Sequence, residues 1–344
     1  MQSTTHGIGI IGLGMAIEPH ARALEDLAGR APVIAACAPS AERRAQFAER
    51  HAFPLVDEVA PILEDPRIDT VLLATPPNAR LDLVKALVAA GKNILMEKPA
   101  GRTTREAARI VEMCELAGVT LGFVFQHRFR EASLELARRL HDDALGRIEM
   151  VHLTVPWWRP QRYYDEPGRG SYERDGGGVL ISQAIHGLDL MLALAGPVAE
   201  VAAIAGTTGL HRMESEDFVG AGLSFGNGAL GALMATTARY PGFPERLEIA
   251  GSKGGARLEA GRLALHFLDG RFEQFGEETS TGGGADPMAF PHDWHRGVWE
   301  DFLDALDEGR APAAGGRDVL RVHRLIDALM RSSKERRHVE LKEV

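Results

Sequence analysis

Gly7-Ile-Gly-Ile-Ile-Gly-Leu-Gly14 is an apolar run that passes directly into a glycine-rich turn. The pattern G-x-G-x-x-G fits this stretch in two registers, one that begins at Gly7 and one that begins at Gly12 and has Ile17 in place of the third glycine. Because the isoleucines must form a buried first strand, the tight turn has to follow Ile11. This selects Gly12 and Gly14 as the turn that leads into a helix.

Such a turn predicts a dinucleotide site. Gly12 permits the turn, and Gly14 lets the backbone approach a pyrophosphate at a helix N-terminus, where free N–H groups and the helix dipole favour anions. An ordinary strand-to-helix turn is the alternative, since the third glycine is missing. We predict that the pyrophosphate is contacted by Gly12, Gly14, Met15 and Ala16.

The first 126 residues continue with short apolar runs that alternate with segments of helical spacing. Runs that are nearly continuous in Val, Ile, Leu and Ala are typical of parallel strands covered on both faces. This rhythm predicts an α/β fold over residues 1–126, a Rossmann dinucleotide-binding domain with a doubly wound sheet. The predicted strands are Gly7 to Ile11, Val33 to Cys37, Thr70 to Thr75, Asn93 to Met96 and Thr120 to Phe125.

After Gln126 the pattern changes, and we predict a second, α+β domain over residues 127–344. Its strand-like runs follow one another with little helix between them, which favours a mainly antiparallel open sheet. Its last helices are free to pack back on the first domain. Predicted helices span residues 131–141, 179–194, 293–308 and 317–332, and predicted strands span 147–155, 198–206, 217–225, 229–238, 245–251 and 256–268.

The length of the chain agrees with two domains, and its net charge bears on its partners. A chain of 344 residues is long enough for two domains. Lys and Arg number 39 and Asp and Glu number 48, so the formal net charge is −9. Because this negative charge is spread along the chain, it argues against nucleic acid as a partner.

Cysteine content and hydropathy indicate the compartment. The two cysteines, Cys37 and Cys114, lie far apart in apolar settings, which favours a reducing environment. The N-terminus lacks the pattern of a signal peptide, and no apolar run approaches the roughly 18 to 20 residues of a membrane span. We predict a cytoplasmic protein with no membrane partner.

Cofactor choice is expected to depend on the end of the second predicted strand, where an acidic residue would bind the 2′-hydroxyl of NAD. The sequence there is Cys37-Ala-Pro-Ser40, with no acid. Ser40 and Arg43, with Arg44 beside them, are suited to a 2′-phosphate, so NADP is slightly favoured over NAD. The alternative is that these arginines form the solvated face of the next helix.

Four motifs together resemble the Gfo/Idh/MocA oxidoreductase family, the sugar and cyclitol dehydrogenases related to glucose-fructose oxidoreductase and inositol dehydrogenase. They follow the order of that family and cover almost the whole chain. The motifs are Ala74-Thr-Pro-Pro-Asn78, Asn93-Ile-Leu-Met-Glu97-Lys98-Pro99, Gln126-His-Arg-Phe129 and Gly176-Gly-Gly-Val-Leu-Ile-Ser-Gln-Ala-Ile-His186-Gly-Leu-Asp189.

The resemblance implies an NAD(P)-dependent dehydrogenase, whose chemistry needs a proton acceptor, a group that stabilises the developing alkoxide and a hydride acceptor. Lys98, after a parallel strand, is expected to place its ammonium on the substrate oxygen. His186 suits the role of the base, because imidazole titrates near neutral pH. Ser182 precedes His186 by four residues, which predicts one shared helix face and a role in orienting it. The nicotinamide half of the cofactor is assigned to Thr75, Pro76, Asn78, Glu97 and Lys98.

Two positions depart from the family pattern. Many members have an Asp four residues before the histidine, where this chain has Ser182. A hydroxyl can hydrogen-bond an imidazole but cannot stabilise an imidazolium as a carboxylate does. The family histidine that follows Thr-Pro-Pro-Asn is also absent, and Arg80 lies near that place. We hypothesise that activity is retained, because Lys98 and His186 are both present.

An aromatic and basic segment after the 147–155 strand suggests a sugar pocket, since aromatic rings cover apolar sugar faces while polar groups supply directed hydrogen bonds. An oligomer or interdomain contact is an equal alternative. His292 and His295 lack a third ligand at useful spacing, so we expect no metal. Predicted substrate contacts are Arg128, Trp158, Arg159, Tyr164 and His186.

The sequence thus predicts hydride transfer between a nicotinamide and a secondary alcohol or carbonyl of a sugar, sugar derivative or cyclitol. A cofactor-binding sensor that has lost catalysis is the alternative, suggested by Ser182. A third possibility is an enzyme that keeps its cofactor bound and recycles it between two substrates. By resemblance, the second domain is expected to bind substrate and to mediate oligomerisation, and its open sheet is expected to form a homodimer or homotetramer.

Overall fold

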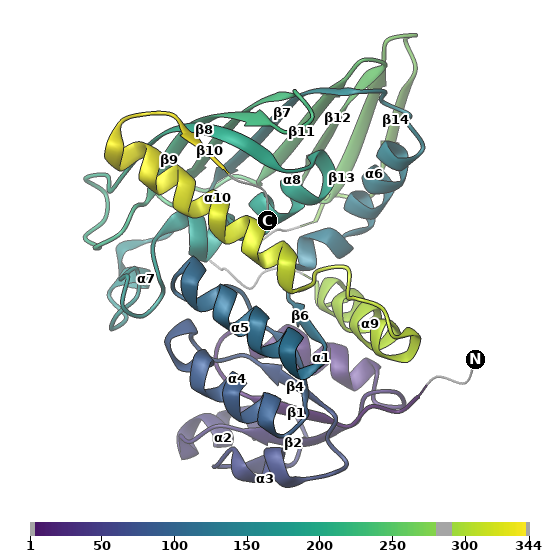
Figure 1. The fold of residues 1–344 in the computed structure, drawn as a ribbon, viewed down its shortest axis with the longest axis vertical. Helices are drawn as coiled ribbons and strands as arrows, with labels where there is room; N and C mark the ends of the chain where they lie inside the picture. The colour runs from purple at the N-terminus through teal and green to yellow at the C-terminus, as the bar shows by residue number, and fades with distance from the viewer. Residues whose placement is uncertain (1–3, 280–290, 342–344) are drawn as a thin grey trace. The chain divides into compact units, whose positions relative to one another are not determined.

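The computed structural model describes residues 4–279 and 291–341, and the chain divides into two compact units (Figure 1). The first unit contains Met1–Gln126 and Pro291–Val319. The second contains His127–Phe290 and Leu320–Val344. The first unit is therefore built from two stretches of sequence that lie far apart in the chain.

The first unit has a parallel sheet of six strands in the order β3-β2-β1-β4-β5-β6, so the predicted doubly wound sheet is confirmed. The sequence reading missed β3, because two residues are too short to give a periodic pattern. The strands are β1 Ile8–Ile11, β2 Val33–Cys37, β3 Leu55–Val56, β4 Thr70–Leu73, β5 Asn93–Met96 and β6 Leu121–Phe123.

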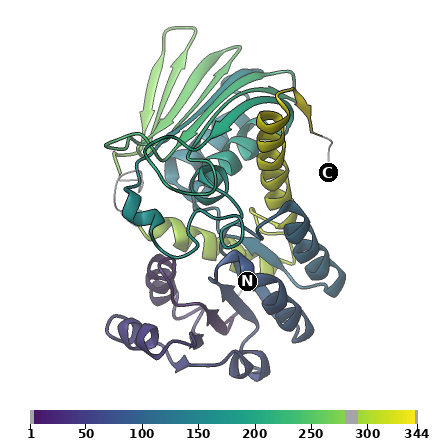
Figure 2. The same cartoon turned by 90° about the vertical axis from the view of Figure 1, so that its left-hand side faces the viewer.

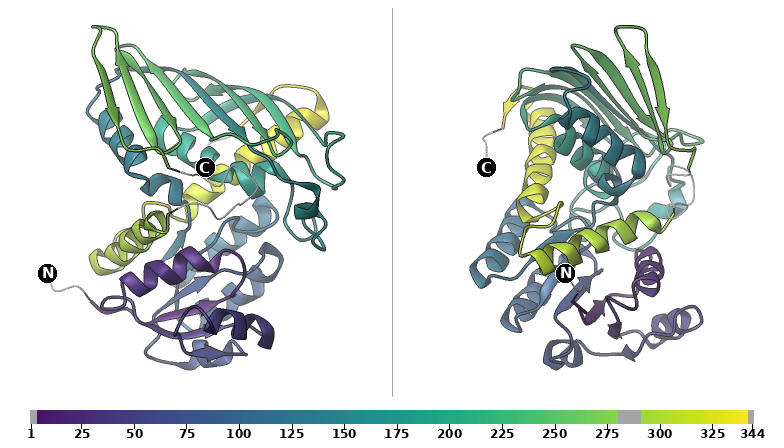
Figure 3. Two further views of the ribbon diagram at one scale, coloured as in Figure 1. Left: turned by 180° about the vertical axis from the view of Figure 1, so that it is seen from behind. Right: turned by 90° about the vertical axis from the view of Figure 1, so that its right-hand side faces the viewer.

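Helices cover both faces of this sheet. Helices α4 and α5 pack together on one face, and α1 lies on the other with α9 beside it (Figures 1 and 3). At Gly122 in β6 an added Cβ atom would lie 2.6 Å from the ring of Phe302, so α9 packs directly on the strand. The helices are α1 Ile17–Asp26, α2 Ala41–Ala48, α3 Ala60–Glu64, α4 Arg80–Ala89, α5 Thr104–Ala117 and α9 Asp293–Glu308.

The second unit has a nine-stranded sheet in the order β14-β13-β12-β11-β7-β10-β9-β8-β15. All pairs are antiparallel except β7 with β10, as predicted for a mainly antiparallel sheet. The strands are β7 Ile148–Pro156, β8 Val198–Gly206, β9 Phe218–Phe225, β10 Leu230–Thr236, β11 Arg246–Gly251, β12 Gly254–Glu259, β13 Arg262–Phe267, β14 Phe272–Phe275 and β15 Val339–Glu340.

The prediction of one strand over residues 256–268 is wrong. Two antiparallel strands, β12 and β13, occupy this region, and a tight hairpin at Ala260 and Gly261 joins them. Both residues have a positive φ, 50° and 80°. Alanine seldom occupies that conformation, so the sequence carries no clear turn signal at this point.

Helices lie on one face of the second sheet (Figures 1 and 2). Helix α8 packs on β7 and β11, and α6 packs on β12 and β13. On the other face, where no helix of the described residues packs, Met150, Ile204 and Leu230 are exposed. The helices are α6 Glu131–His141, α7 Gln161–Tyr164, α8 Ile185–Ala195 and α10 Gly316–Glu335, of which α10 begins in the first unit.

Within the described ranges, none of the helices combines the length and the hydropathy that crossing a membrane requires.

Candidate active site

The candidate site of the first unit lies at the carboxyl edge of its parallel sheet. Here β1 leads into Gly12, β4 leads towards Thr75, and β5 leads into Glu97 and Lys98. Strands β1, β4 and β5 are neighbours, and the strand order reverses between β1 and β4. Open α/β sheets bind ligands outside this edge at such a switch point.

The two glycines of the first turn have different surroundings. Gly12 has φ +107°, and a Cβ atom there would lie 2.7 Å from the carbonyl oxygen of Ala74. The packing of β1 against the end of β4 therefore requires glycine at this position. At Gly14 a Cβ atom would meet nothing within 4 Å. The described chain itself does not require glycine there, and the open space suits the close approach of a ligand.

The N-terminus of α1 has no side-chain cap among the described residues. Its N-cap residue is Ala16, whereas Ser40 caps α2 and Thr103 caps α5. The first N–H groups of a helix need partners from outside it, and the helix dipole makes an anion a favourable one. Met15, beside this turn, is 53% exposed.

Arg80, in the first turn of α4, is a buried cation that binds only backbone carbonyls in the contacts described. Its Nε and Nη2 donate to the carbonyl of Thr75 at 3.0 and 2.6 Å. Its Nη1 donates to the carbonyls of Glu97 and Pro99, and Nη2 reaches that of Lys98 at 3.5 Å. Burial lowers the pKa of Arg80 to about 10, although the nearby Glu97 opposes this shift. The guanidinium therefore remains charged at neutral pH.

Glu97 is the anion that accompanies this cation. Its Oε2 accepts the backbone N–H of Lys98 at 3.1 Å, and its Oε1 lies 3.0 Å from Nε2 of His20. Burial raises the pKa of Glu97, but the hydrogen bond from His20 and the charges around it lower the pKa further, so the net shift is downward. The carboxylate is therefore ionised at neutral pH and holds the backbone of Lys98 in place.

His20, Glu97 and His295 form a buried group whose ligand atoms lie within 4.8 Å of one another. Trp299 Nε1–H donates to His20 Nδ1 at 3.2 Å. Indole N–H is only a donor, so His20 must carry its proton on Nε2 and donate it to Glu97. Nε2 then carries the proton and the lone pair of Nδ1 accepts the indole N–H, so neither ring nitrogen has a free lone pair for a metal ion. The geometry fits a hydrogen-bonded relay from Trp299 to Glu97, and it does not fit a metal centre.

In the second unit the glycine run precedes the helix of His186. A Cβ atom at Gly178 would lie 1.8 Å from the carbonyl oxygen of Glu216. The Glu216 side chain accepts the backbone N–H groups of Gly178 and Leu180, both at 3.1 Å. The glycines therefore allow this helix start to pack against the segment before β9, and a carboxylate from the chain itself caps it.

Ser182 lies in a π-helical turn, Leu180–Ala184, which α8 then continues. Hydrogen bonds of the i→i+5 type widen such a turn, and single π turns are frequent at functional sites. The sequence predicted one regular α-helix over 179–194, with Ser182 one α-helical turn before His186. That helix prediction is wrong at its start, because the π turn changes the offset between the two side chains.

His186 is buried and stacks on His127, with ring centroids 4.9 Å apart and planes inclined by 29°. Arg130 donates to Nε2 of His127 at 2.5 Å, and it also pairs with Glu245 at 2.6 Å. Because an arginine can only donate, Nε2 of His127 must be the acceptor, so the neutral ring carries its proton on Nδ1. His186 therefore faces a ring whose neutral form Arg130 favours.

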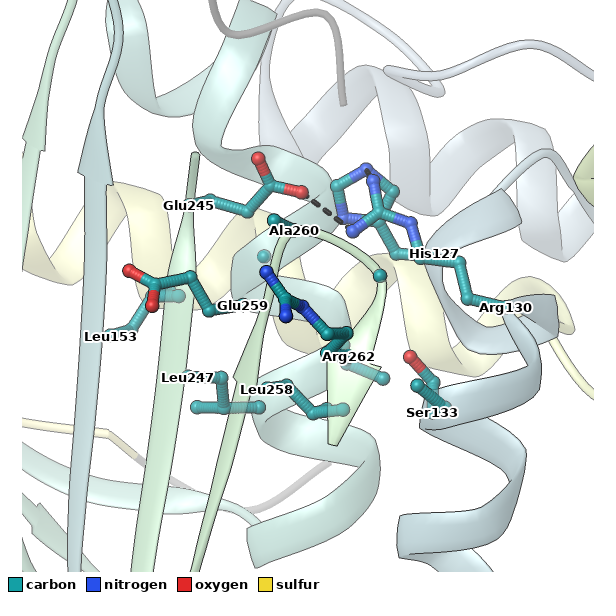
Figure 4. Close-up of a pocket in the computed structure, with 14 residues that line it drawn as sticks. His127, Arg130, Ser133, Leu153, Glu245, Leu247, Leu258, Glu259, Ala260 and Arg262 are labelled. Carbon is teal, nitrogen blue, oxygen red and sulfur yellow. Dashed lines mark hydrogen bonds and ion pairs between the residues drawn. The ribbon is translucent and has the colours of Figure 1, made fainter. Parts of the chain in front are cut away.

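The ion pair of Arg130 and Glu245 borders a cavity of about 30 Å³ (Figure 4). Its wall also includes His127, Ser133 and Arg262. A space of this size holds about one or two water molecules, so it is too small for a sugar.

Comparison with known proteins places these features in a family. Residues 6–125 match the GFO_IDH_MocA oxidoreductase family with its NAD-binding Rossmann fold, and residues 133–257 match the GFO/IDH/MocA C-terminal domain. The chain belongs to the Gfo/Idh/MocA oxidoreductase family. The predicted family and the predicted class, an oxidoreductase that uses a nicotinamide cofactor, are confirmed.

Relatives of this Gfo/Idh/MocA protein match it along nearly its whole length. It is 27% identical to D-apiose dehydrogenase of Paraburkholderia graminis, over 97% of this chain and 89% of that protein. It is 24% identical to inositol 2-dehydrogenase of Rhizobium meliloti, over 97% of this chain and 98% of that protein. The WlbA dehydrogenase from Bordetella pertussis, solved with NADH and UDP-GlcNAcA, is 27% identical, with a TM-score of 0.84 over 100% of both chains.

Two arginines predicted to contact substrate are engaged within the second unit of this family member. Arg128 forms two hydrogen bonds to Asp189, at 2.7 and 2.6 Å. Arg159 is 2% exposed, and its guanidinium lies over the rings of Trp157 and Tyr163. Both arginines therefore have structural partners, and their predicted contacts with substrate remain predictions.

His211, which the sequence reading missed, organises the aromatic segment. It is buried. The centroid of its ring lies 5.8 Å from the ring centroid of Trp158 and 4.8 Å from that of Tyr164. Nδ1 lies 2.8 Å from an Asp217 oxygen and Nε2 lies 2.8 Å from the carbonyl of Arg159. Both partners are acceptors, so both ring nitrogens donate and His211 is an imidazolium. Nothing in the sequence near His211 signals this role, because Asp217 reaches it only through the loop before β9.

The residues predicted for the cofactor remain predictions, but their positions are described. Ser40 Oγ accepts the backbone N–H of Arg43, whose side chain is exposed. Arg44 donates to the carbonyls of Ala38 and Pro39 at 2.6 and 2.9 Å. In the turn after β4, Thr75 is half-buried, and Pro76 and Asn78 are exposed.

Stability is expected to depend on pH through His211. Burial lowers the pKa of His211, but Asp217 and the Arg159 carbonyl raise it further, so the net shift is upward. The stabilisation is therefore fully present below about pH 6.5, the unfolded value, and is lost as pH rises through the folded pKa. His211→Gln should lower the free energy of unfolding by about 3–5 kcal/mol at pH 6, with a smaller loss at pH 9. Urea unfolding of both proteins at the two pH values measures this, and an equal loss at both would contradict it.

Proposed function

We propose that this chain transfers a hydride between a nicotinamide and a secondary alcohol or carbonyl of a sugar, sugar derivative or cyclitol. The observation that carries the proposal is the placement of Lys98. It is half-buried at the carboxyl end of β5, and its backbone is held by Glu97 and Arg80. The relatives named D-apiose dehydrogenase and inositol 2-dehydrogenase support a polyhydroxy substrate.

Each proposed catalytic residue has a role that suits its surroundings. The ammonium of Lys98 stabilises the negative charge that develops on the substrate oxygen. His186 accepts the hydroxyl proton, and Ser182 orients the pair formed by Lys98 and His186. The π-stacked ring of His127, whose neutral form Arg130 favours, adds no full charge beside His186. The nicotinamide, when bound, supplies the acceptor for the hydride.

A sensor that binds cofactor and sugar without turnover is the second candidate. Ser182 favours it, because no carboxylate stands there to stabilise an imidazolium at His186. An enzyme that retains its cofactor would differ from both, since the purified protein would already carry nucleotide absorbance.

Turnover distinguishes these functions. Absorbance of the reduced nicotinamide is measured after mixing the protein with cyclitols, aldoses and uronates and either NAD or NADP. Lys98→Met should lower kcat by at least about 100-fold, the scale expected for one charge-stabilising group, and His186→Asn by about 100-fold as the base is lost.

Lys85→Met serves as the control, because the exposed Lys85 forms its hydrogen bond and ion pair with Asp82, which is also exposed. Its turnover should equal that of the unaltered protein. Cofactor binding with no turnover in any pool would favour the sensor, and unchanged turnover in Lys98→Met would remove Lys98 from the mechanism.

For the cofactor we propose NADP or NAD, with NADP slightly preferred. The end of β2 carries no carboxylate over residues 37–40, and Arg43 is exposed next to it. A 2′-phosphate would gain from a guanidinium there, whereas the 2′-hydroxyl of NAD would lack an acidic partner.

Substitutions at this strand end should change the preference. Arg43→Ala should lower kcat/KM with NADP by about 10-fold, the scale of 1–2 kcal/mol for one charge-assisted bond, and leave NAD nearly unchanged. Ser40→Asp, which retains a helix cap, should favour NAD. Equal effects of Arg43→Ala on both cofactors would contradict a role in binding the 2′-phosphate.

We further propose a homodimer or homotetramer formed through the uncovered face of the nine-stranded sheet. Ile204 on β8 is 74% exposed and Leu230 on β10 is 63% exposed. Exposed apolar side chains on one sheet face favour association with a second copy.

Light scattering measures the oligomeric state. The unaltered protein should have the mass of two or four chains of 37.3 kDa. Ile204→Glu should shift it towards the monomer, because a charge would be buried at the interface. Glu115→Lys, at an exposed position of α5 in the first unit, is the control. A monomeric unaltered protein would refute the proposal.

A further inference from the structure

Arg80 uses every hydrogen-bond donor of its side chain on the backbone at one edge of the sheet. A guanidinium has five N–H groups in a fixed plane. The five hydrogen bonds of Arg80 run to four carbonyls, those of Thr75, Glu97, Lys98 and Pro99. The side chain is 2% exposed, so these carbonyls are paired where water does not reach the guanidinium.

Three of the four carbonyls belong to consecutive residues, so Lys98 lies at the centre of the bonded segment. The carbonyl of Glu97 orients the peptide plane before Lys98, and the carbonyl of Lys98 orients the plane after it. The N–H of Lys98 is held separately by the Glu97 side chain at 3.1 Å. Arg80, which lies outside residues 97–99, thus holds both peptide planes that determine the direction of the Lys98 side chain.

We propose that Arg80 is a positioning residue that acts on the reaction through Lys98, an inference that rests on the proposed function. Arg80 does not itself touch the reacting atoms in this proposal. It stands near the place where the family pattern has a histidine, so this way of holding Lys98 is a feature of this chain. The bond to Thr75 also ties Lys98 to the turn after β4, which is the turn assigned to the nicotinamide.

Other side chains cannot reproduce this arrangement. A neutral histidine donates one hydrogen bond, and a lysine donates three from a single point. Neither side chain reaches carbonyls on two strand ends in one plane. Arg80→Lys would keep the charge and lose the planar geometry, while Arg80→Gln would lose both.

The first test is amide hydrogen exchange, which needs no turnover. Exchange at the Lys98 amide, resolved by mass spectrometry with electron-transfer fragmentation, is compared in the unaltered protein, Arg80→Lys and Arg80→Gln. Both variants should exchange at least about tenfold faster at Lys98, because opening of this segment no longer breaks the guanidinium bonds. The control is Arg67→Lys, since the Arg67 side chain is 72% exposed and pairs with Asp65.

The second test is a double-mutant cycle on kcat with Lys98→Met. Arg80→Gln alone should lower kcat by about 100-fold, as expected for a misplaced catalytic group. In the Lys98→Met background the same change should alter the residual rate by no more than about twofold, because residues that act as a unit are not additive. The substrate KM should change less than kcat.

The outcomes separate this proposal from the proposed function. An unchanged exchange rate at the Lys98 amide in both folded Arg80 variants would overturn the positioning role. So would a further loss of about 100-fold in kcat when Arg80→Gln is added to Lys98→Met, or a kcat of Arg80→Lys equal to that of the unaltered protein. An unaltered protein without turnover on any sugar would refute the proposed function, and the exchange comparison would then still decide whether Arg80 holds the Lys98 backbone.

Discussion

Peptide carbonyls at the carboxyl ends of parallel strands need donors that the sheet no longer provides, and buried carbonyls without partners are costly. In this chain the donors at the ends of β4 and β5 come from the guanidinium of Arg80. The fold at this edge depends on that interaction, because it holds together the turn after β4 and the segment that carries Lys98. The same residue brings a buried positive charge into the site, and the ionised Glu97 lies close enough to offset it.

Donor and acceptor chemistry also fixes the state of several buried histidines. Trp299 determines the tautomer of His20, and Arg130 determines that of His127. His211 lies between two acceptors and is therefore charged. Burial lowers the pKa of His295 to about 3, and the neighbouring His20 contributes to this shift, so His295 is neutral. These histidines thus differ in tautomer or in charge because their partners differ, and only His186 is proposed to exchange a proton with substrate.

The two units meet different demands of the same proposed reaction. The first unit offers a helix N-terminus at α1 that no described side chain caps and a lysine held by its backbone. The second offers His186 on a helix that starts with a π turn and is capped by Glu216. Where the family often has a carboxylate, this chain has Ser182, and the ring that stacks on His186 is that of His127.

The sequence by itself determined the doubly wound sheet, the register of the first glycine turn and most of the second sheet. These features follow from local periodicity and from the burial of apolar runs, which neighbouring residues report directly. Lys98 and His186 were also predicted from sequence as catalytic residues, because each stands in a contiguous motif, and their roles remain a proposal. Only the tertiary structure decided the roles of Arg80, Trp299 and His211. The hydrogen-bond partners of Arg80 lie 5 to 19 residues away in sequence, and the partner of Trp299 lies 279 residues away. Hydrogen bonds between distant segments leave no periodic trace in the sequence, since the fold alone brings the donor to its acceptor.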